Sequence, residues 1–212
     1  MTWNVARLDE LDRIPVGDTG LEWRPIRSRF GIEAFGINAY TAANVGDEIV
    51  EAHTEESLEH EEVYIVLSGR ATFTLDGEEV DAPAGTIVHL PETATRRSAI
   101  AQEPGTTVLA VGAKPGEAYT PSAWESSFRA AHLAREGDSA AAIALMEERL
   151  ARDTGDADAH YNLACFLSLG GERERSLEHL GRAIEIAPRF GEYAKTDRDF
   201  DPMRDDVTAL TG

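Results

Sequence analysis

The segment 46–91 constrains the fold most, because short β-type runs alternate there with turn residues. Residues 63–67 form an apolar, β-branched run that stops at Ser68-Gly69. Residues 71–75 alternate apolar and polar side chains, and Asp76-Gly77 then gives a tight-turn signal, because glycine supplies the positive φ that two-residue hairpins require. Short strands with turns at this spacing predict a β-sandwich or a β-barrel.

The rest of the first half continues this pattern. Residues 1–34 are expected to hold irregular structure or edge strands, and Trp23-Arg24-Pro25-Ile26 is typical of an edge strand, because proline cannot donate a ladder hydrogen bond. Five more runs are expected to be strands, namely 35–40, 49–53, 80–82, 86–90 and 107–111.

The second half changes character. Residues 114–121 contain a proline and a glycine and indicate a linker. Residues 122–212 are rich in Ala, Leu, Glu and Arg and predict helices, beginning with the capping-box sequence Ser122-Ala123-Trp124-Glu125. This part is similar to itself at an offset of 34 residues, with Gly137 aligned with Gly171. That period predicts repeated helix–turn–helix units.

Charge and cysteine content exclude several functions. The net charge is −19 and the pI is near 4.6, so a nucleic-acid backbone or an anionic membrane surface would be repelled. Cys165 is the single cysteine, which excludes an internal disulfide and fits a reducing cytosol. Neither a signal sequence nor an apolar run of about 20 residues is recognisable. We therefore expect a cytoplasmic protein that binds neither nucleic acid nor membrane.

The β-rich part contains four short motifs, namely Glu62-x6-Gly69, Asp76-Gly77-Glu78, Pro83-Ala84-Gly85 and Pro91 at the end of an expected strand. With these motifs, residues 35–113 resemble the cupin family. The resemblance implies a jelly-roll barrel that holds a divalent metal. In cupins the first motif supplies two histidines and a glutamate, and the second motif supplies a third histidine five residues after its proline.

The ligands that this resemblance implies are altered in this chain. His53 is followed two residues later by Glu55 instead of histidine, and His60 stands two residues before Glu62. Because side chains alternate along a strand, His60 and Glu62 share one face, and His53 and Glu55 share a face of the preceding strand. Two imidazoles and two carboxylates can therefore converge. Five residues after the motif proline stands Arg96, which cannot bind a metal because it stays protonated.

His89 can replace the missing ligand if it points inward, whereas an outward His89 would be a half-exposed strand residue. Arg96 and Tyr64 are the candidate substrate-binding residues, although Arg96 beside Arg97 could equally be surface charge. A mixed set of histidines and carboxylates suits Mn, Fe, Ni or Zn and does not select among them. The candidate metal ligands are His53, His60, Glu62, Glu55 and His89.

The helical part resembles the tetratricopeptide family through the packing positions of its second copy, which are Leu163, Ala164, Gly171, Leu180, Ala183 and Pro188. The first copy is weaker, because Arg129 and Arg149 stand where small or apolar residues are usual. Residues after Gly191 are expected to form a final capping helix. Such arrays bind peptides, but helices this few can also serve only for packing or self-association. His132, His160 and His179 are expected to pack or face solvent.

Two functional hypotheses follow for an α+β multidomain chain with an arm at 1–34, a β jelly-roll barrel at 35–113, a linker at 114–121 and tetratricopeptide-like hairpins at 122–212. In the first, a metal-dependent enzyme of oxygenase, isomerase or decarboxylase type acts on a small molecule. In the second, the barrel is a ligand-sensing or scaffold module that needs no metal, as in some cupins, and the helices bind a protein partner. Resemblance to cupins also implies a homodimer.

Overall fold

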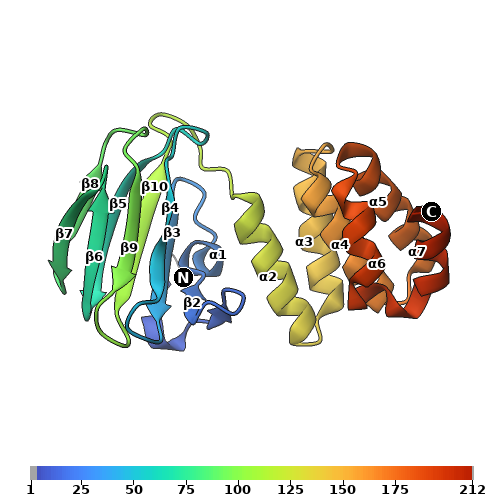
Figure 1. Cartoon of the computed structure of the whole chain (residues 1–212), viewed down its shortest axis with the longest axis horizontal. Coiled ribbons are helices and arrows are strands. Elements are labelled where there is room, and N and C mark those ends of the chain that lie inside the picture. Colours follow the sequence, from blue (N-terminus) through green and yellow to red (C-terminus); the bar gives the residue numbers. More distant parts are fainter. Residues whose placement is uncertain (1–3, 212) are drawn as a thin grey trace. The chain divides into compact units, whose positions relative to one another are not determined.

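The computed structural model describes residues 4–211, and the chain divides into two compact units, Met1–Thr120 and Pro121–Gly212. Each unit is described by itself. The first unit consists mainly of β-sheets, and the second consists of helices (Figure 1). Residues 1–3, the beginning of the predicted arm, lie outside the described residues. Among the described residues, no helix is long and apolar enough to span a lipid bilayer.

The first unit contains two antiparallel sheets (Figure 1). Their strands are β1 (Ile14–Pro15), β2 (Leu21–Arg24), β3 (Gly36–Ala42), β4 (Glu48–His53), β5 (Glu61–Ser68), β6 (Arg70–Leu75), β7 (Glu78–Pro83), β8 (Ile87–Leu90), β9 (Arg97–Ala101) and β10 (Thr107–Ala113). One sheet has the order β1-β2-β3-β10-β5-β8 and the other has the order β4-β9-β6-β7.

The order of the eight strands β3 to β10 is that of a double-sheet jelly roll. β3, β10, β5 and β8 form one side, and β4, β9, β6 and β7 form the other, so that consecutive strands repeatedly cross between the sheets. β1 and β2 extend the first sheet beyond β3. The expected jelly-roll strand order is therefore present, and the predicted N-terminal arm is partly absorbed into the sheet.

The core of this unit lies between the inner faces of the two sheets. Phe73 on β6 and Val108 on β10 are fully buried, and Tyr64 on β5 packs against the Phe73 ring at 5.7 Å between ring centroids. The turn from β5 to β6 depends on Gly69, which has φ of 71°. A Cβ at Gly69 would also lie 2.4 Å from Thr106 Oγ1, so the turn requires glycine.

Two local predictions for this unit were wrong, and two of its elements were not predicted. β2 is an interior strand between β1 and β3, and Pro25 follows it and precedes a short helix, α1 (Ile26–Phe30), that was not expected. β5 begins at Glu61, so His60 precedes the strand instead of belonging to it. Strand β9 was not predicted at all. Its sequence, Arg-Ser-Ala-Ile-Ala, contains two alanines, which have low β-propensity.

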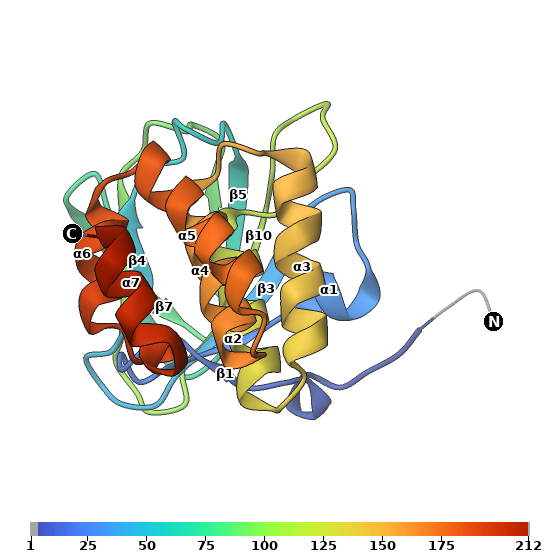
Figure 2. The same cartoon turned by 90° about the vertical axis from the view of Figure 1, so that its right-hand side faces the viewer.

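The second unit consists of antiparallel helices (Figure 2). They are α2 (Ala123–Arg135), α3 (Ser139–Arg152), α4 (Ala157–Leu169), α5 (Arg173–Ile186), α6 (Arg189–Thr196), the 3₁₀ helix η2 (Arg198–Met203) and α7 (Arg204–Thr211). The hairpin α4–α5 repeats the hairpin α2–α3, and every boundary is displaced by 34 residues. Gly137 and Gly171 occupy equivalent turns with φ of 89° and 78°, a conformation that glycine tolerates best.

Caps and buried residues explain the helix boundaries. Ser122 accepts a hydrogen bond from the Glu125 backbone N–H at 3.1 Å, which confirms the predicted cap of α2. Cys165 is buried, as expected for a packing thiol. Arg149, unusual at its repeat position, donates to Asp156 at 2.7 Å, the residue that caps α4. The predicted single capping helix after Gly191 is instead three pieces, α6, η2 and α7.

His160 on α4 and His179 on α5 form a hydrogen bond with 2.9 Å between their Nδ1 atoms. His160 Nε2 lies 3.2 Å from the Thr154 carbonyl oxygen, and because a carbonyl only accepts, this nitrogen carries a proton. In the neutral pair, His179 Nδ1 therefore donates to His160 Nδ1. Burial is the main cause that lowers the pKa of His179, and the neighbouring His160 lowers it further.

We expect the helical unit to lose stability as the pH falls below about 6.5. Below this pH the unfolded chain binds a proton on His179, whereas the folded unit does not, because the pKa of His179 is lowered on folding. The free energy of unfolding therefore decreases as the pH falls from about 6.5 towards the pKa of the folded state. Thermal unfolding followed by helical circular dichroism at about pH 7.5 and about pH 5.5 measures the loss. His179→Gln should reduce it and His132→Gln, on α2, should not. An unchanged loss in His179→Gln would contradict this prediction.

Candidate functional site

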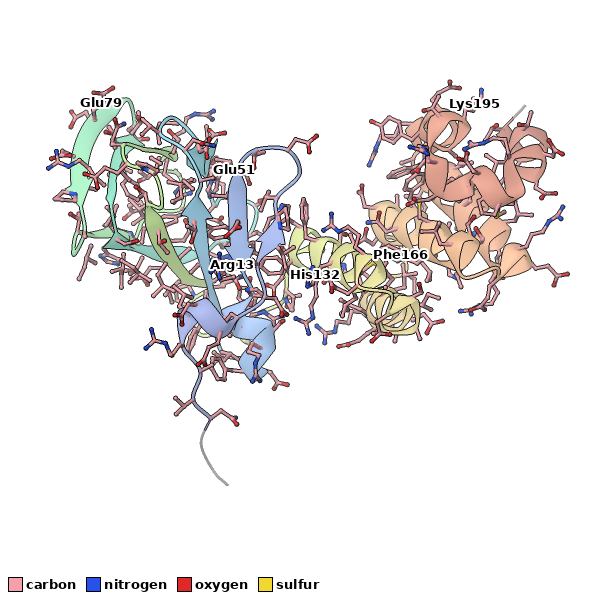
Figure 3. The ribbon with its side chains drawn as sticks, turned by 90° about the horizontal axis from the view of Figure 1, so that it is seen from below. Arg13, Glu51, Glu79, His132, Phe166 and Lys195 are labelled. Carbon is pink, nitrogen blue, oxygen red and sulfur yellow. The ribbon has the colours of Figure 1, made fainter. Side chains whose placement is uncertain are left out.

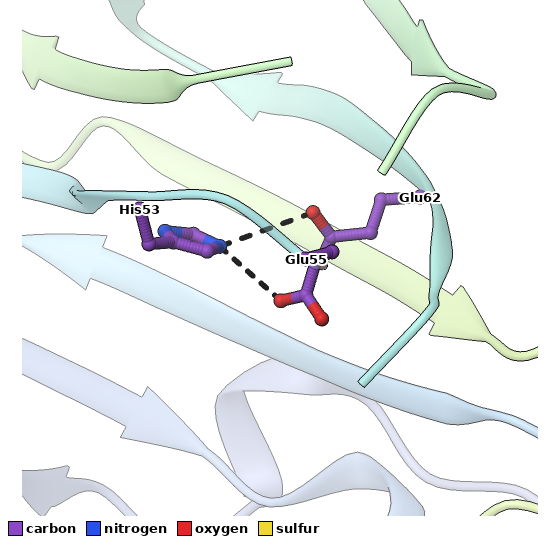
Figure 4. A group of neighbouring side chains, drawn as sticks. All are labelled: His53, Glu55 and Glu62. Atoms are coloured by element: carbon purple, nitrogen blue, oxygen red, sulfur yellow. Dashed lines mark ion pairs between the residues drawn. The ribbon is translucent and has the colours of Figure 1, made fainter. Parts of the chain in front are cut away.

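Three ionisable side chains meet inside the first unit, as Figure 4 shows. His53 Nε2 lies 3.3 Å from Glu55 Oε1 and 4.0 Å from Glu62 Oε2. One nitrogen or oxygen atom from each of the three residues lies within 4.8 Å of the others. Glu55 is 7% exposed, and the side chains of Glu62 and His53 are 12% and 28% exposed. The group is therefore mostly buried and is reached by solvent at His53.

The three residues come from neighbouring parts of the chain. His53 is the last residue of β4, and Glu62 lies near the start of β5. Glu55 lies in the bend between these strands, where its N–H donates to the Thr93 carbonyl oxygen at 2.9 Å. The bend closes with a hydrogen bond from the Glu59 N–H to the Glu55 carbonyl oxygen at 2.6 Å, with Glu59 at φ of 56°. Glu55 is thus positioned by the turn and not by strand alternation.

The protonation of His53 is governed by its two ring nitrogens. Nδ1 lies 2.7 Å from the Glu51 carbonyl oxygen, so Nδ1 donates and Nε2 carries the lone pair in the neutral ring. Nε2 faces Glu55 and Glu62. The hydrogen bond with Glu55 is the main cause that raises the pKa of His53, and burial opposes it. Without another cation, the two carboxylates therefore favour a proton on His53.

Glu62 is held by two further residues. The Tyr64 hydroxyl donates to Glu62 Oε2 at 2.7 Å, and Arg97 Nε lies 3.5 Å from the same oxygen. Burial is the main cause that raises the pKa of Glu62, while the Tyr64 hydroxyl lowers it. Burial also raises the pKa of Tyr64, which keeps its hydroxyl protonated as a donor. Tyr64 was expected to bind substrate, and the structure places it beneath Glu62, where it orients the carboxylate.

His60 adjoins the group from the other side of Glu55. Its Nδ1 lies 3.4 Å from Glu55 Oε2, and its ring packs near Tyr119 at 5.6 Å between centroids. The structure therefore brings together four of the predicted ligands, His53, Glu55, His60 and Glu62. The predicted shared face of His60 and Glu62 is replaced by a loop position for His60.

His89 and Arg96 do not belong to this group. His89 lies on the outer face of β8, where its Nε2 is 2.7 Å from Glu61 Oε1 and its side chain is 51% exposed. Of the two orientations left open for His89, the structure has the outward one, because Val88 and Leu90 occupy the inner face of that strand. Arg96 is exposed and precedes β9, and its backbone N–H donates to Asp76 Oδ1 at 2.8 Å.

Arg97, one residue later, is the arginine that faces the interior, and sequence reasoning missed it. It begins β9, pairs in register with His53 on β4, and is 0% exposed. The signal available in the sequence was strand alternation, because Arg97 is two and four residues from the small residues Ala99 and Ala101 and so shares a strand face with them. Both alanines are fully buried on the inner face. Strand β9 itself was not recognised, so this parity could not be used.

No family model matches the chain, and no curated protein matches it. Solved structures match its N-terminal half. KdgF from Halomonas sp. is 19% identical, with 52% of this chain and 93% of that chain covered at a TM-score of 0.43. A sugar phosphate isomerase of the cupin superfamily from Silicibacter pomeroyi is 18% identical, with 52% and 76% covered at a TM-score of 0.44.

A predicted oxalate decarboxylase from Thermotoga maritima is 16% identical to this chain, with 52% of this chain and 99% of that chain covered at a TM-score of 0.43. These matches cover only the N-terminal half of the chain, and their identities and TM-scores are low. The jelly-roll assignment rests on the strand order of the two sheets.

Proposed function

We propose that the first unit binds a divalent transition metal through His53, Glu55 and Glu62, with His60 beside them, and that the metal binds a small molecule. The supporting observation is that one donor atom of each of the first three residues lies within 4.8 Å of the others. Imidazole nitrogen and carboxylate oxygen are the ligands that Mn, Fe, Ni and Zn accept. The donor set supports a metal without selecting among these four.

The electrostatics of the group support a cation. Glu55 Oε2 is buried and has no hydrogen-bond partner among the described residues. His53 offers the Nε2 lone pair because its Nδ1 is committed to the Glu51 carbonyl oxygen. Two mostly buried carboxylates, Glu55 and Glu62, have only Arg97 as a permanent cation recorded beside them among the described residues. A divalent cation would bind Glu55 Oε2, whose contact with His60 Nδ1 at 3.4 Å is not a hydrogen bond, and would balance the remaining charge.

The chemistry that such a metal supplies when bound is polarisation of an oxygen of the small molecule. The chain's own residues would fix the site for this purpose. Contacts with Tyr64 and Arg97 orient the Glu62 carboxylate, and the turn at residues 55–59 orients Glu55. His53 is the partly exposed member of the group, so the small molecule would enter beside it.

The metal content of purified full-length protein tests this proposal. Protein made without a metal-binding tag and dialysed against Mn, Fe, Ni or Zn should retain one metal per chain. His53→Ala should lower retention to roughly a tenth or less, because it removes a nitrogen ligand. His89→Ala is the matched control, since this histidine lies in the same unit on the outer face. Full retention by His53→Ala, or equal losses in both variants, would refute the assignment.

A metal-free ligand-binding module is the second candidate, and Arg97 favours it. The fully buried guanidinium places a permanent positive charge 3.5 Å from Glu62 and neutralises part of the charge that a metal would balance. In this alternative the helical unit, whose 34-residue period resembles tetratricopeptide hairpins, binds a protein partner. Absence of metal after dialysis against all four ions, with native folding retained, would favour this candidate.

A further inference from the structure

A separate cavity of about 490 Å³ lies on the outer side of the six-stranded sheet. It is lined by Arg7, Leu8, Asp9, Arg24, Thr41 and Thr107. Thr41 and Thr107 are register partners on β3 and β10, and their neighbours Ala42 and Val108 belong to the core. Because side chains alternate along a strand, the two threonines face away from the core and from Glu62. The cavity is therefore distinct from the candidate metal group.

The floor of the cavity is polar. The Thr41 and Thr107 hydroxyl oxygens lie 3.0 Å apart, and the Thr107 hydroxyl donates to the Gly105 carbonyl oxygen at 3.2 Å. On β2, Glu22 pairs in register with Thr41, and Arg24 lies two residues further along the strand on the same face. The cavity floor therefore spans three adjacent strands, β2, β3 and β10.

The remaining lining residues of the cavity belong to the segment that precedes β1. Arg7 and Asp9 form a two-point ion pair, with 3.0 Å between Nε and Oδ1 and 3.1 Å between Nη2 and Oδ2. This segment is anchored on the unit by Leu11 and Ile14, which are 7% and 0% exposed. Arg7 and Asp9 thus neutralise each other and leave Arg24 as the cation of the cavity wall.

Arg24 is the unusual group in this wall. It is 5% exposed, and among the described residues its polar contact is from Nη2 to Glu22 Oε2 at 3.1 Å. Its Nε and Nη1 have no hydrogen-bond partner among the described residues. Leaving buried guanidinium donors unpaired is costly, and arginine normally uses its fork to bind a carboxylate or phosphate at two points.

The charge around Arg24 also favours an anion. Arg13, labelled in Figure 3 and located just before β1, adds a second positive charge that acts on Arg24. Burial, followed by Arg13, lowers the pKa of Arg24, while Glu22 and Asp9 raise it. Arg7 is paired to Asp9 and Arg24 uses one nitrogen for Glu22, so the Nε and Nη1 donors of Arg24 stay available to an oxyanion.

We propose that this cavity binds a small organic anion whose carboxylate or phosphate group pairs with Arg24, with Thr41 and Thr107 contacting its polar body. The volume of about 490 Å³ lies within the range of small-molecule sites and exceeds that of a single phosphate ion. The planar guanidinium matches either oxyanion. The ligand is thus a metabolite-sized molecule with an oxyanion group, bound independently of the metal proposed above.

Arginine side-chain NMR of the full chain tests this proposal. Inorganic phosphate, pyrophosphate and succinate are titrated at constant ionic strength, and the Nε–Hε signal of Arg24 is followed with the backbone signals of Thr41 and Thr107. At least one probe should give saturable shifts in all three residues. The probe that binds best distinguishes a phosphate ligand from a carboxylate ligand. Protein stripped of metal beforehand and dialysed free of the chelator should give the same shifts, which separates this cavity from the metal group.

Variants decide whether Arg24 carries the binding. Arg24→Gln should weaken binding about tenfold or more, and Arg24→Lys should give an intermediate loss, because lysine keeps the charge but lacks the fork. Arg70→Gln is the matched control, since this arginine is 47% exposed and pairs with Asp81 on the other sheet. Thermal unfolding establishes that each variant is folded. Absence of saturable shifts with all three probes, or equal weakening by Arg70→Gln, would overturn the proposal.

Discussion

Glu62→Gln is expected to lower the free energy of unfolding of the metal-free protein by about 3–5 kcal/mol, because it leaves a buried charge without its partner. Arg97 is 0% exposed, and its three guanidinium nitrogens have no hydrogen-bond partner among the described residues. Its recorded ionic contact is the one with Glu62 at 3.5 Å. Glutamine keeps the shape and can still accept the Tyr64 hydroxyl, so the variant removes the charge alone.

Urea unfolding in the presence of EDTA measures this effect. The unfolding is monitored by NMR signals of β5 and β6, so that the helical unit does not contribute. Glu61→Gln is the matched control, because this neighbour is 48% exposed and pairs only with His89 at the surface. Its expected cost is below about 1 kcal/mol. Adding Arg97→Met to Glu62→Gln should restore most of the lost stability, since no unpaired charge then remains. A single variant as stable as Glu61→Gln would contradict the buried pair.

Phe73→Ala is expected to destabilise the first unit by about 3–5 kcal/mol. The Phe73 ring is fully buried on the inner face of β6, and truncation would leave a cavity between the two sheets. The ring also contacts Tyr64, which holds Glu62, so the cavity would loosen the candidate site. Metal retention should therefore fall together with stability.

The same urea unfolding experiment checks this second prediction. Val80→Ala is its matched control, because Val80 is the register partner of Phe73 on β7 and is 36% exposed. Its expected cost is within about 1 kcal/mol, because Val80 is partly exposed and its truncation removes a much smaller side chain than that of Phe73. Phe73→Leu, which refills part of the volume, should fall between the two. Equal effects of Phe73→Ala and Val80→Ala would contradict the assigned core.

Local pattern predicted much of the architecture. The β5–β6 and β6–β7 turns follow from Ser68-Gly69 and Asp76-Gly77, because positive φ is a local requirement that glycine meets. The 34-residue displacement of the helical hairpins was visible as a sequence repeat, because each repeat reuses the same packing positions. Such features depend on a few neighbouring residues, which is why one sequence sufficed to predict them.

The candidate site was only partly predictable. His53, Glu55, His60 and Glu62 lie within ten residues of one another, so a short connection brings them together. Strand alternation nevertheless gave the wrong reason for two of them, because the turn after β4 positions Glu55 and His60. His89 was left open between two faces, and the neighbours Val88 and Leu90 settle it on the outer face. A shift of one residue along a strand moves a side chain from one face of the sheet to the other, so the face of His89 depends on the exact register.

The sequence by itself determined most of the strands, the repeated helical hairpins, the division into a β part and a helical part, and the closeness of the four residues around Glu62. These features depend on residues near one another in the chain. Only the tertiary structure decided that Arg97 lies beside Glu62 and that Arg24 lines a cavity with Arg7 and Thr107. These contacts join residues separated by many positions, through the pairing of β9 with β4 and of β3 with β10. Register and sheet stacking fix such neighbours, and neither is written in local residue patterns.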